Sequence, residues 1–124
     1  MAKRRPAVFC PCGSSTTYES CCGMLHRGEK TAATAEQLMR SRYSAFVVGD
    51  VAYLLRTWSA KTRPPSLELD ATDWTGLEIL GTTAGTAFHT EGTVEFRASY
   101  TGGAQQENSY FTREHGDWVY VAPR

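Results

Sequence analysis

Four cysteines are the residues best suited to chemistry in this chain, and they form two close pairs. One pair lies in Cys10-Pro11-Cys12-Gly13 and the other in Cys21-Cys22-Gly23, with eight residues between them. When such a loop folds back, four thiolates can surround one ion in a tetrahedron with Zn–S distances of ~2.3 Å, as in a structural zinc site. We therefore predict one structural Zn²⁺ held by Cys10, Cys12, Cys21 and Cys22, with no open position for a catalytic water.

Other interpretations of the cysteines remain open. Disulfides would need an oxidising compartment and would close strained rings within each pair. A redox pair usually has the spacing C-x-x-C, and iron–sulfur ligation uses four cysteines at other spacings. His26 is an alternative fourth ligand, because imidazole also suits zinc, although we expect it at the surface.

Composition and charge restrict the remaining classes of function. The 124 residues are 41% hydrophobic, enough for one globular core. Their formal net charge is zero, so we do not expect nucleic-acid binding except through the basic cluster Lys3-Arg4-Arg5. No apolar run approaches the ~20 residues needed to cross a bilayer, which predicts no membrane insertion. No apolar stretch follows the basic cluster, so we expect a cytoplasmic protein with reduced thiols.

The uneven distribution of charge suggests two parts. Residues 1–30 carry a net charge of +3 and all four cysteines, whereas the remaining residues carry −3. This first part shows neither helical nor strand periodicity and cannot close a core of its own, so it needs a cross-link. We predict a zinc-binding motif over 1–30 and a second domain over 31–124.

The second part begins with helical signals and continues with strands. Thr34 and Gln37 form a capping box, and Gly49 ends the apolar periodicity that follows it. Asp50 can cap a second helix that carries Trp58 and ends before the prolines at 64 and 65. Alternating residues then predict an antiparallel sheet. The expected elements are helices over about 35–48 and 51–58, a strand from Trp74 through Ile79, and strands over about 93–100, 106–114 and 118–122, the last two joined through His115-Gly116-Asp117.

These motifs resemble known families. Cys10-Pro11-Cys12-Gly13-Ser14, Tyr18 and Cys21-Cys22-Gly23 are similar to the SEC-C motif, a small zinc-binding module. The rest of the chain resembles the bacterial YchJ family, also called UPF0225. The segments that carry this resemblance are Leu38 to Ala45, Tyr53 to Trp58, Gly92 to Phe96 and Trp118 to Val121. The resemblance implies an α+β, NTF2-like (cystatin-like) fold, in which a curved antiparallel sheet wraps around helices to form a conical pocket, and it implies no established reaction.

Arg42 is the favoured pocket residue. It lies on the apolar side of the first helix, where a buried guanidinium needs a carboxylate or an anionic ligand. Pairing with Glu95 or Glu107, or a position at the surface above an apolar stem, are the alternatives. Glu95 and Arg97 share one strand face, and a solvent-facing ladder is the simpler interpretation of that pair. The candidate pocket set is Arg42, Tyr43, Trp58, Glu95, Glu107 and Ser109.

Two classes of function follow. We expect a non-enzymatic protein that binds either a small molecule in the pocket or a protein partner through the zinc motif. The alternative is a small lyase or isomerase, with Glu95 or Glu107 as general base and Tyr43 or Tyr110 as proton donor. That alternative rests on analogy with other NTF2-like pockets. A homodimer through the outer face of the sheet is left open.

Overall fold

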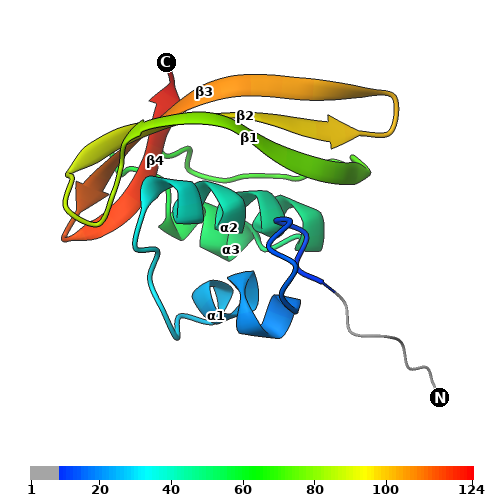
Figure 1. Ribbon diagram of the computed structural model, residues 1–124, viewed down its shortest axis with the longest axis horizontal. Helices are drawn as coiled ribbons and strands as arrows, with labels where there is room; N and C mark the ends of the chain where they lie inside the picture. Colours follow the sequence, from blue (N-terminus) through cyan, green and yellow to red (C-terminus); the bar gives the residue numbers. More distant parts are fainter. Residues whose placement is uncertain (1–8) are drawn as a thin grey trace.

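The computed structural model describes residues 9–124 (Figure 1). The basic cluster at residues 3–5 lies outside the described residues. The elements are, in chain order, the 3-10 helix η1 (Tyr18–Ser20), the helices α1 (Cys22–His26), α2 (Ala35–Val48) and α3 (Val51–Arg56), and the strands β1 (Trp74–Ala84), β2 (Glu91–Tyr100), β3 (Gly103–Glu114) and β4 (Asp117–Pro123).

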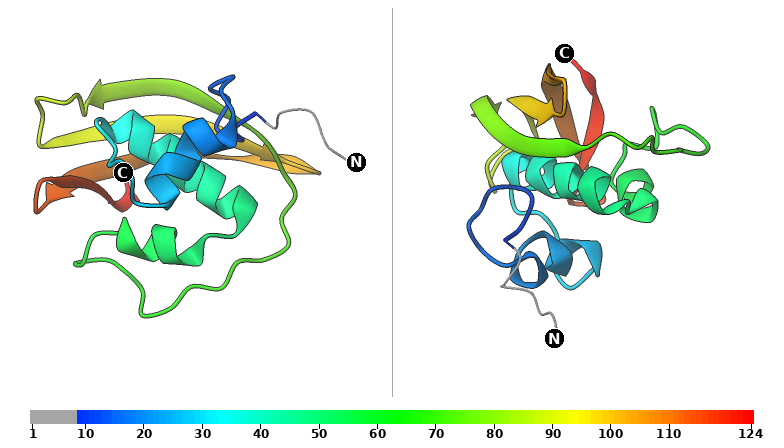
Figure 2. Two further views of the ribbon diagram at one scale, coloured as in Figure 1. Left: turned by 90° about the horizontal axis from the view of Figure 1, so that it is seen from below. Right: turned by 90° about the vertical axis from the view of Figure 1, so that its right-hand side faces the viewer.

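The elements form three layers (Figures 1 and 2). The curved sheet lies over α2 and α3, which make the middle layer. The segment that contains η1 and α1 lies on the opposite side of α2 from the sheet. An α+β fold with helices covering the concave face of an antiparallel sheet was expected from the sequence, and it is confirmed.

The capping features that the sequence predicts are present at both ends of α2. The Thr34 hydroxyl oxygen accepts a 3.0 Å hydrogen bond from the Gln37 N–H, and the Gln37 side chain accepts one of 2.7 Å from the Ala33 N–H. Gly49 ends the helix in the left-handed conformation, at φ +82°. The helix predicted over 35–48 therefore has the expected ends.

The second helix is shorter than predicted. Asp50 caps it as expected, by accepting a 3.0 Å hydrogen bond from the Tyr53 N–H. However, α3 ends at Arg56, so Trp58 is not helical. Backbone hydrogen bonds from the Tyr120 N–H to the Thr57 oxygen and from the Ser59 N–H to the Tyr120 oxygen, of 2.8 and 2.7 Å, attach this segment to β4 instead.

The four strands pair in sequence order, each antiparallel to the next. Three predicted boundaries need correction. β1 continues past Ile79 to Ala84. β3 begins at Gly103 rather than near 106, because it pairs with β2 as far as Tyr100. The last hairpin loop contains only His115 and Gly116, both at positive φ, and Asp117 already pairs with Glu114.

Alternate residues of β2 face the helices. Val94, Phe96 and Ala98 are buried, whereas Arg97 between them is exposed. The core also contains Leu38, Leu54 and Phe111, which are almost fully buried. Within the described part of the chain, none of the helices has the length and apolar character that crossing a membrane requires.

Candidate functional site

The four cysteines converge on one point. All four Sγ atoms lie within 4.8 Å of one another, and those of Cys12 and Cys21 are 3.6 Å apart. A tetrahedral ion with bonds of ~2.3 Å places its sulfur ligands ~3.8 Å apart. All four cysteines are free thiols, and Cys10, Cys12 and Cys22 are buried. The donor set and its spacing therefore fit a single metal ion.

Two local backbone features create this convergence. In the first cysteine pair, the Cys10 N–H donates to the Thr16 oxygen at 2.7 Å, and Gly13, at φ +88°, turns the chain directly after Cys12. In the second, Cys21 stands between η1 and α1 with φ −127° and ψ −112°. This break in regular structure allows adjacent side chains to reach the same point, whereas in a strand they would face opposite sides.

Gly23 is required by close packing. A Cβ atom at this position would lie 2.7 Å from the Tyr18 carbonyl oxygen. Contacts this short between a Cβ and a backbone oxygen cannot form without moving the backbone. The glycine after the second cysteine pair thus allows α1 to pack against η1.

The thiols influence one another strongly. Hydrogen bonds from Cys12 and Cys22 lower the pKa of Cys10. The bonds of Cys22 to Cys10 and Cys12 raise the pKa of the Cys22 thiol, and burial raises it further. Four thiolates this close repel one another, so a cation among them would stabilise the ionised set.

The segment that carries the cysteines is attached to α2. The Arg40 Nη1 donates a 2.7 Å hydrogen bond to the Cys12 carbonyl oxygen, and the Cys10 Sγ lies 3.5 Å from the Ser44 Oγ. The Arg56 guanidinium donates to the His26 carbonyl oxygen at 3.0 Å. These contacts cross the predicted boundary between residues 30 and 31.

His26 is buried, contrary to the surface position expected from the sequence. Its Nε2 lies 2.9 Å from the Ser41 carbonyl oxygen and its Nδ1 lies 2.6 Å from the Tyr18 hydroxyl. With the proton on Nε2, the ring donates to Ser41 and accepts from Tyr18. Both ring nitrogens are thus engaged away from the sulfur cluster, and His26 connects α1 to α2.

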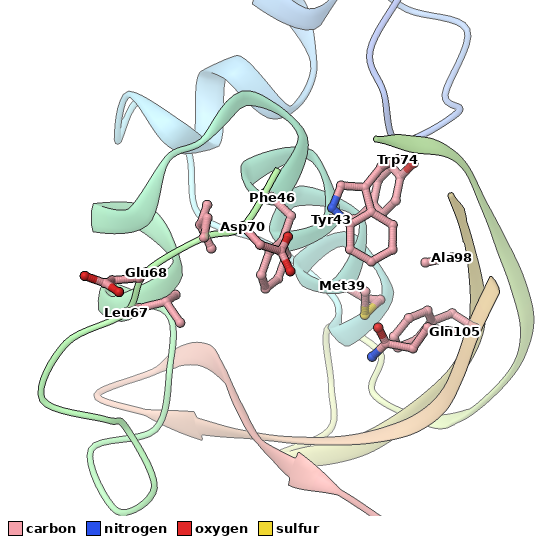
Figure 3. Close-up of a pocket in the computed structure, with 11 residues that line it drawn as sticks. Met39, Tyr43, Phe46, Leu67, Glu68, Asp70, Trp74, Ala98 and Gln105 are labelled. Carbon is pink, nitrogen blue, oxygen red and sulfur yellow. The ribbon is translucent and has the colours of Figure 1, made fainter. Parts of the chain in front are cut away.

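A cavity of about 300 Å³ opens between α2, the sheet and the loop before β1 (Figure 3). In the close-up, Met39 and Tyr43 of α2 face Ala98 and Gln105 of the sheet, and Trp74 closes one end. Its lining is mainly apolar, and its charged residues, Glu68 and Asp70, lie on the exposed loop. We call this space the apolar cavity.

A smaller cavity of about 140 Å³ adjoins the first. Both are lined by Met39, Phe46, Phe96 and Gln105. The smaller one is also lined by the polar or aromatic residues Arg42, Trp58, Glu107, Ser109 and Tyr120. We call this space the polar cavity.

The structure brings together four of the six candidate pocket residues and separates the other two. Arg42, Trp58, Glu107 and Ser109 line the polar cavity, whereas Tyr43 lines the apolar cavity.

Glu95 lies on the outer face of the sheet, where it accepts a 3.0 Å hydrogen bond from Gln106. The reason is register: Glu107 pairs with Phe96 and shares its inward face, so Glu95, one residue earlier, faces outward opposite Asn108. Glu95 is therefore removed from the pocket set, and Arg97 beside it pairs with Glu78 at 3.3 Å on the same outer face.

None of the base and donor pairs considered for an enzyme lines a single one of these two cavities. Tyr110 faces outward and donates a 2.6 Å hydrogen bond to Glu91. Tyr43 and Glu107 line different cavities.

Arg42 is buried, as expected, but its partners differ from those considered. Only 4% of the residue is exposed. Its Nη1 donates 2.8 Å hydrogen bonds to the Leu54 carbonyl oxygen and the Thr57 hydroxyl oxygen. No carboxylate among residues 9–124 lies within ion-pair distance of it. Burial lowers the pKa of Arg42 to about 10, so the group remains charged at neutral pH.

Tyr120 is a cavity residue that sequence reasoning missed. Its hydroxyl donates a 3.0 Å hydrogen bond to Glu107, and its ring lies 4.8 Å from the Arg42 guanidinium carbon. Burial, with the Glu107 carboxylate, raises the pKa of Tyr120, which therefore stays a hydrogen-bond donor. The alternation of the last strand, which places Tyr120 on the same face as Trp118, was the available signal.

Comparisons with known proteins agree with this architecture. Residues 34–123 match the family model described as "YchJ, middle NTF2-like domain". A UPF0225 protein of Streptomyces coelicolor is 61% identical over 117 residues, covering 94% of each chain. One from Corynebacterium glutamicum is 51% identical over 115 residues, covering 90% of this chain and 92% of the relative.

Two solved structures are similar over most of the chain. The solution structure of a SEC-C motif containing protein from Rhodopseudomonas palustris has a TM-score of 0.79 and 33% identity, and covers 93% of this chain and 96% of that one. The crystal structure of another, from Psychrobacter arcticus, has a TM-score of 0.75 and 29% identity, and covers 92% and 80% of the two chains. The NTF2-like fold predicted from the sequence is confirmed.

Proposed function

Since the chain belongs to the UPF0225 family of YchJ-like proteins, with an NTF2-like domain, we propose that it is a non-enzymatic protein that binds a small molecule. In this proposal one structural Zn²⁺ folds its N-terminal segment. The ion links the two cysteine pairs and supplies no reaction chemistry. We place the protein in the cytoplasm, where thiols stay reduced and available to a metal.

The donor set favours zinc as the ion. Four sulfur ligands in a tetrahedron select soft or borderline ions, and zinc is the usual occupant of such closed sites. The ion would also stabilise residues 9–30, because this segment has few apolar side chains to bury. Apart from Leu25, which belongs to the main core, the buried apolar residues of 9–30 are cysteines, with Tyr18 packed against them. Without a metal, this cluster would bury three thiols and little else.

A binding role is favoured over catalysis by the chemistry of the two cavities. The larger one is apolar, as expected for a site that holds a ligand by burial. The single carboxylate in the polar cavity, Glu107, already accepts hydrogen bonds from Ser109 and Tyr120. One of its two oxygens is therefore already occupied by hydroxyl groups of the protein itself.

The observation that carries the proposal is the position of α2 between the two sites. Arg40 and Ser44 contact Cys12 and Cys10 on one side of the helix. Met39 and other residues on the opposite side line the cavities. A metal ion that fixes the N-terminal segment against α2 therefore also stabilises one wall of the binding site.

Native mass spectrometry of the untagged protein, compared with the denatured mass, tests both parts. We expect one zinc per chain, lost in Cys12→Ser and retained in the control Ser20→Ala, together with a retained organic mass. A denatured mass four hydrogens lower and no metal would indicate two disulfides and contradict the zinc site. A metal-loaded protein that neither retains nor binds any small molecule would contradict the binding function. The same spectrum shows whether the protein forms a homodimer, which the sequence left open.

A further inference from the structure

Resting on the proposed binding function, we infer that the polar cavity takes an uncharged ligand head that carries both a hydrogen-bond acceptor and a hydrogen-bond donor. A primary carboxamide or a cyclic imide has this chemistry. The apolar body of the same ligand would occupy the apolar cavity.

The polar cavity contains hydrogen-bond donors that have no partner in the described part of the protein, so a ligand that binds there should carry a hydrogen-bond acceptor. Arg42 uses only its Nη1 in hydrogen bonds to the residues that the structure describes. Its Nε and Nη2 have no such partner, and neither atom is enclosed by the protein. Both are therefore accessible. Trp58 Nε1 also lacks a partner within residues 9–124, but it is enclosed, so a ligand does not reach it directly. A ligand oxygen could accept hydrogen bonds from the Nε and Nη2 of Arg42, which are costly to leave unpaired in a poorly solvated space.

Glu107 offers an acceptor in the same cavity. Glu107 Oε2 accepts hydrogen bonds of 2.6 Å from the Ser109 hydroxyl and 3.0 Å from the Tyr120 hydroxyl. No donor within the described range bonds to its Oε1. This oxygen is not enclosed by the protein, so it is accessible. A ligand N–H or O–H could therefore donate to Oε1.

The charges that line the polar cavity favour a ligand head without a net charge. Arg42 and Glu107 are the charged residues that line the polar cavity, and they carry opposite charges. They do not touch, because the Tyr120 ring covers the guanidinium while its hydroxyl bonds to the carboxylate. A charged ligand group would leave one charge uncompensated in a poorly solvated space, which is unfavourable. A neutral group with one acceptor and one donor meets both residues without that cost.

The position of the apolar body follows from the shared lining. Met39, Phe46, Phe96 and Gln105 border both cavities, so a ligand with its head near Arg42 continues toward Tyr43 and Trp74. The volume of about 300 Å³ lies at the lower end of the range for small-molecule sites, roughly 300–1,000 Å³. It suits an aromatic ring or a short alkyl chain.

Three probes of nearly equal shape test the head chemistry. Benzamide is neutral, benzoate is an anion and benzamidine is a cation at pH 7. Dissociation constants come from chemical-shift titrations of the ¹⁵N-labelled, metal-loaded protein. We expect benzamide to bind at least ~10-fold more tightly than either ion, since burying an unpaired charge is costly. The Trp58 indole N–H resonance should shift with benzamide.

A matched pair of variants tests the charge argument. Glu107→Gln removes the negative charge while keeping the side-chain shape, so the cavity becomes net positive and benzoate should become the tightest of the three probes. Glu95→Gln makes the same change on the outer face of the sheet and should leave the order unchanged.

Several outcomes would overturn the inference. Benzoate or benzamidine binding to the unmodified protein as tightly as benzamide would overturn the neutral head while leaving the binding function intact. An unchanged order in folded Glu107→Gln would overturn the role of Glu107. If none of the probes binds, the inference is overturned, and retention of some other molecule in the native mass spectrum then decides the binding function separately. If Glu107→Gln does not fold, the order of the probes on the unmodified protein decides alone.

Discussion

The Arg40 guanidinium donates a 2.7 Å hydrogen bond to the Cys12 carbonyl oxygen, although 28 residues separate the two in the chain. This bond joins the first cysteine loop to the middle of α2. Arg40 is itself held by Glu36, one helical turn earlier, through an ion pair of 3.0 Å. The position of the loop on the domain is thus set by charged side chains of a helix as well as by the thiols.

Metal removal should unfold the N-terminal segment before the sheet. In the proposed zinc-bound form, the ion connects the cysteines of residues 9–30, whereas β2 and β3 are held by long antiparallel pairing. Hydrogen exchange followed by mass spectrometry, with and without a chelator, should show lost protection over 9–30, a partial loss in α2 and little change in the strands. Chelator saturated beforehand with zinc is the control. Equal protection with and without the ion would contradict this expectation.

Two glycine variants should differ in stability. Gly23→Ala would place a Cβ 2.7 Å from the Tyr18 carbonyl oxygen, whereas no atom lies within 4 Å of a Cβ at Gly76. We expect Gly23→Ala to lower the free energy of unfolding by about 1–3 kcal/mol. We expect Gly76→Ala to be neutral or slightly stabilising, because alanine restricts the unfolded chain. Urea denaturation of both variants checks the difference, and equal midpoints would count against the packing argument.

Arg42 should contribute to stability through hydrogen bonds as well as to ligand binding. Arg42→Met leaves the Leu54 carbonyl oxygen without its 2.8 Å donor in a buried position. The expected loss is about 2–4 kcal/mol. Arg97→Met is the matched control, because Arg97 is half-exposed and its ion pair with Glu78 is a surface pair, worth less than about 1 kcal/mol. Chemical denaturation measures both; a similar loss in the two variants would disprove the special role of Arg42.

The Glu114 carboxylate should make stability depend on pH in the acid range. Hydrogen bonds from the Ser59 hydroxyl, at 2.5 Å, and the Ala60 N–H, at 3.2 Å, lower the pKa of Glu114 from its ordinary value of 4.5. A carboxyl with a lower pKa in the folded protein stabilises it fully above the unfolded pKa, and this contribution is lost as pH falls through the folded pKa.

Thermal unfolding between pH 7 and pH 3 checks this prediction. The difference in Tm between the unmodified protein and Glu114→Gln should be constant above about pH 5 and should shrink below it. Glu68→Gln, at an exposed loop position, controls for the general loss of a negative charge. A difference that stays constant down to pH 3 would contradict the assignment to Glu114.

Much of the local structure could be predicted from the sequence. The cysteine spacing indicated four thiols that the structure brings within 4.8 Å of one another, and Thr34, Gln37, Gly49 and Asp50 marked helix ends that the structure shows. The alternation in β2 correctly separated buried Val94 and Phe96 from the outward Glu95 and Arg97. These features depend on neighbours in the chain, because caps and strand faces are determined within a few residues.

Tertiary contacts decided the composition of the cavities. Glu107 lines the polar cavity because the register of β2 and β3 places it opposite Phe96, and Tyr120 reaches it from β4. His26 is buried because α2 supplies the Ser41 carbonyl oxygen, 15 residues along the chain. Register and the docking of distant segments depend on how apolar faces pack and on which loops close. The sequence by itself determined which side chains could bind a metal or a ligand, and the folding of distant segments against one another determined which of them meet.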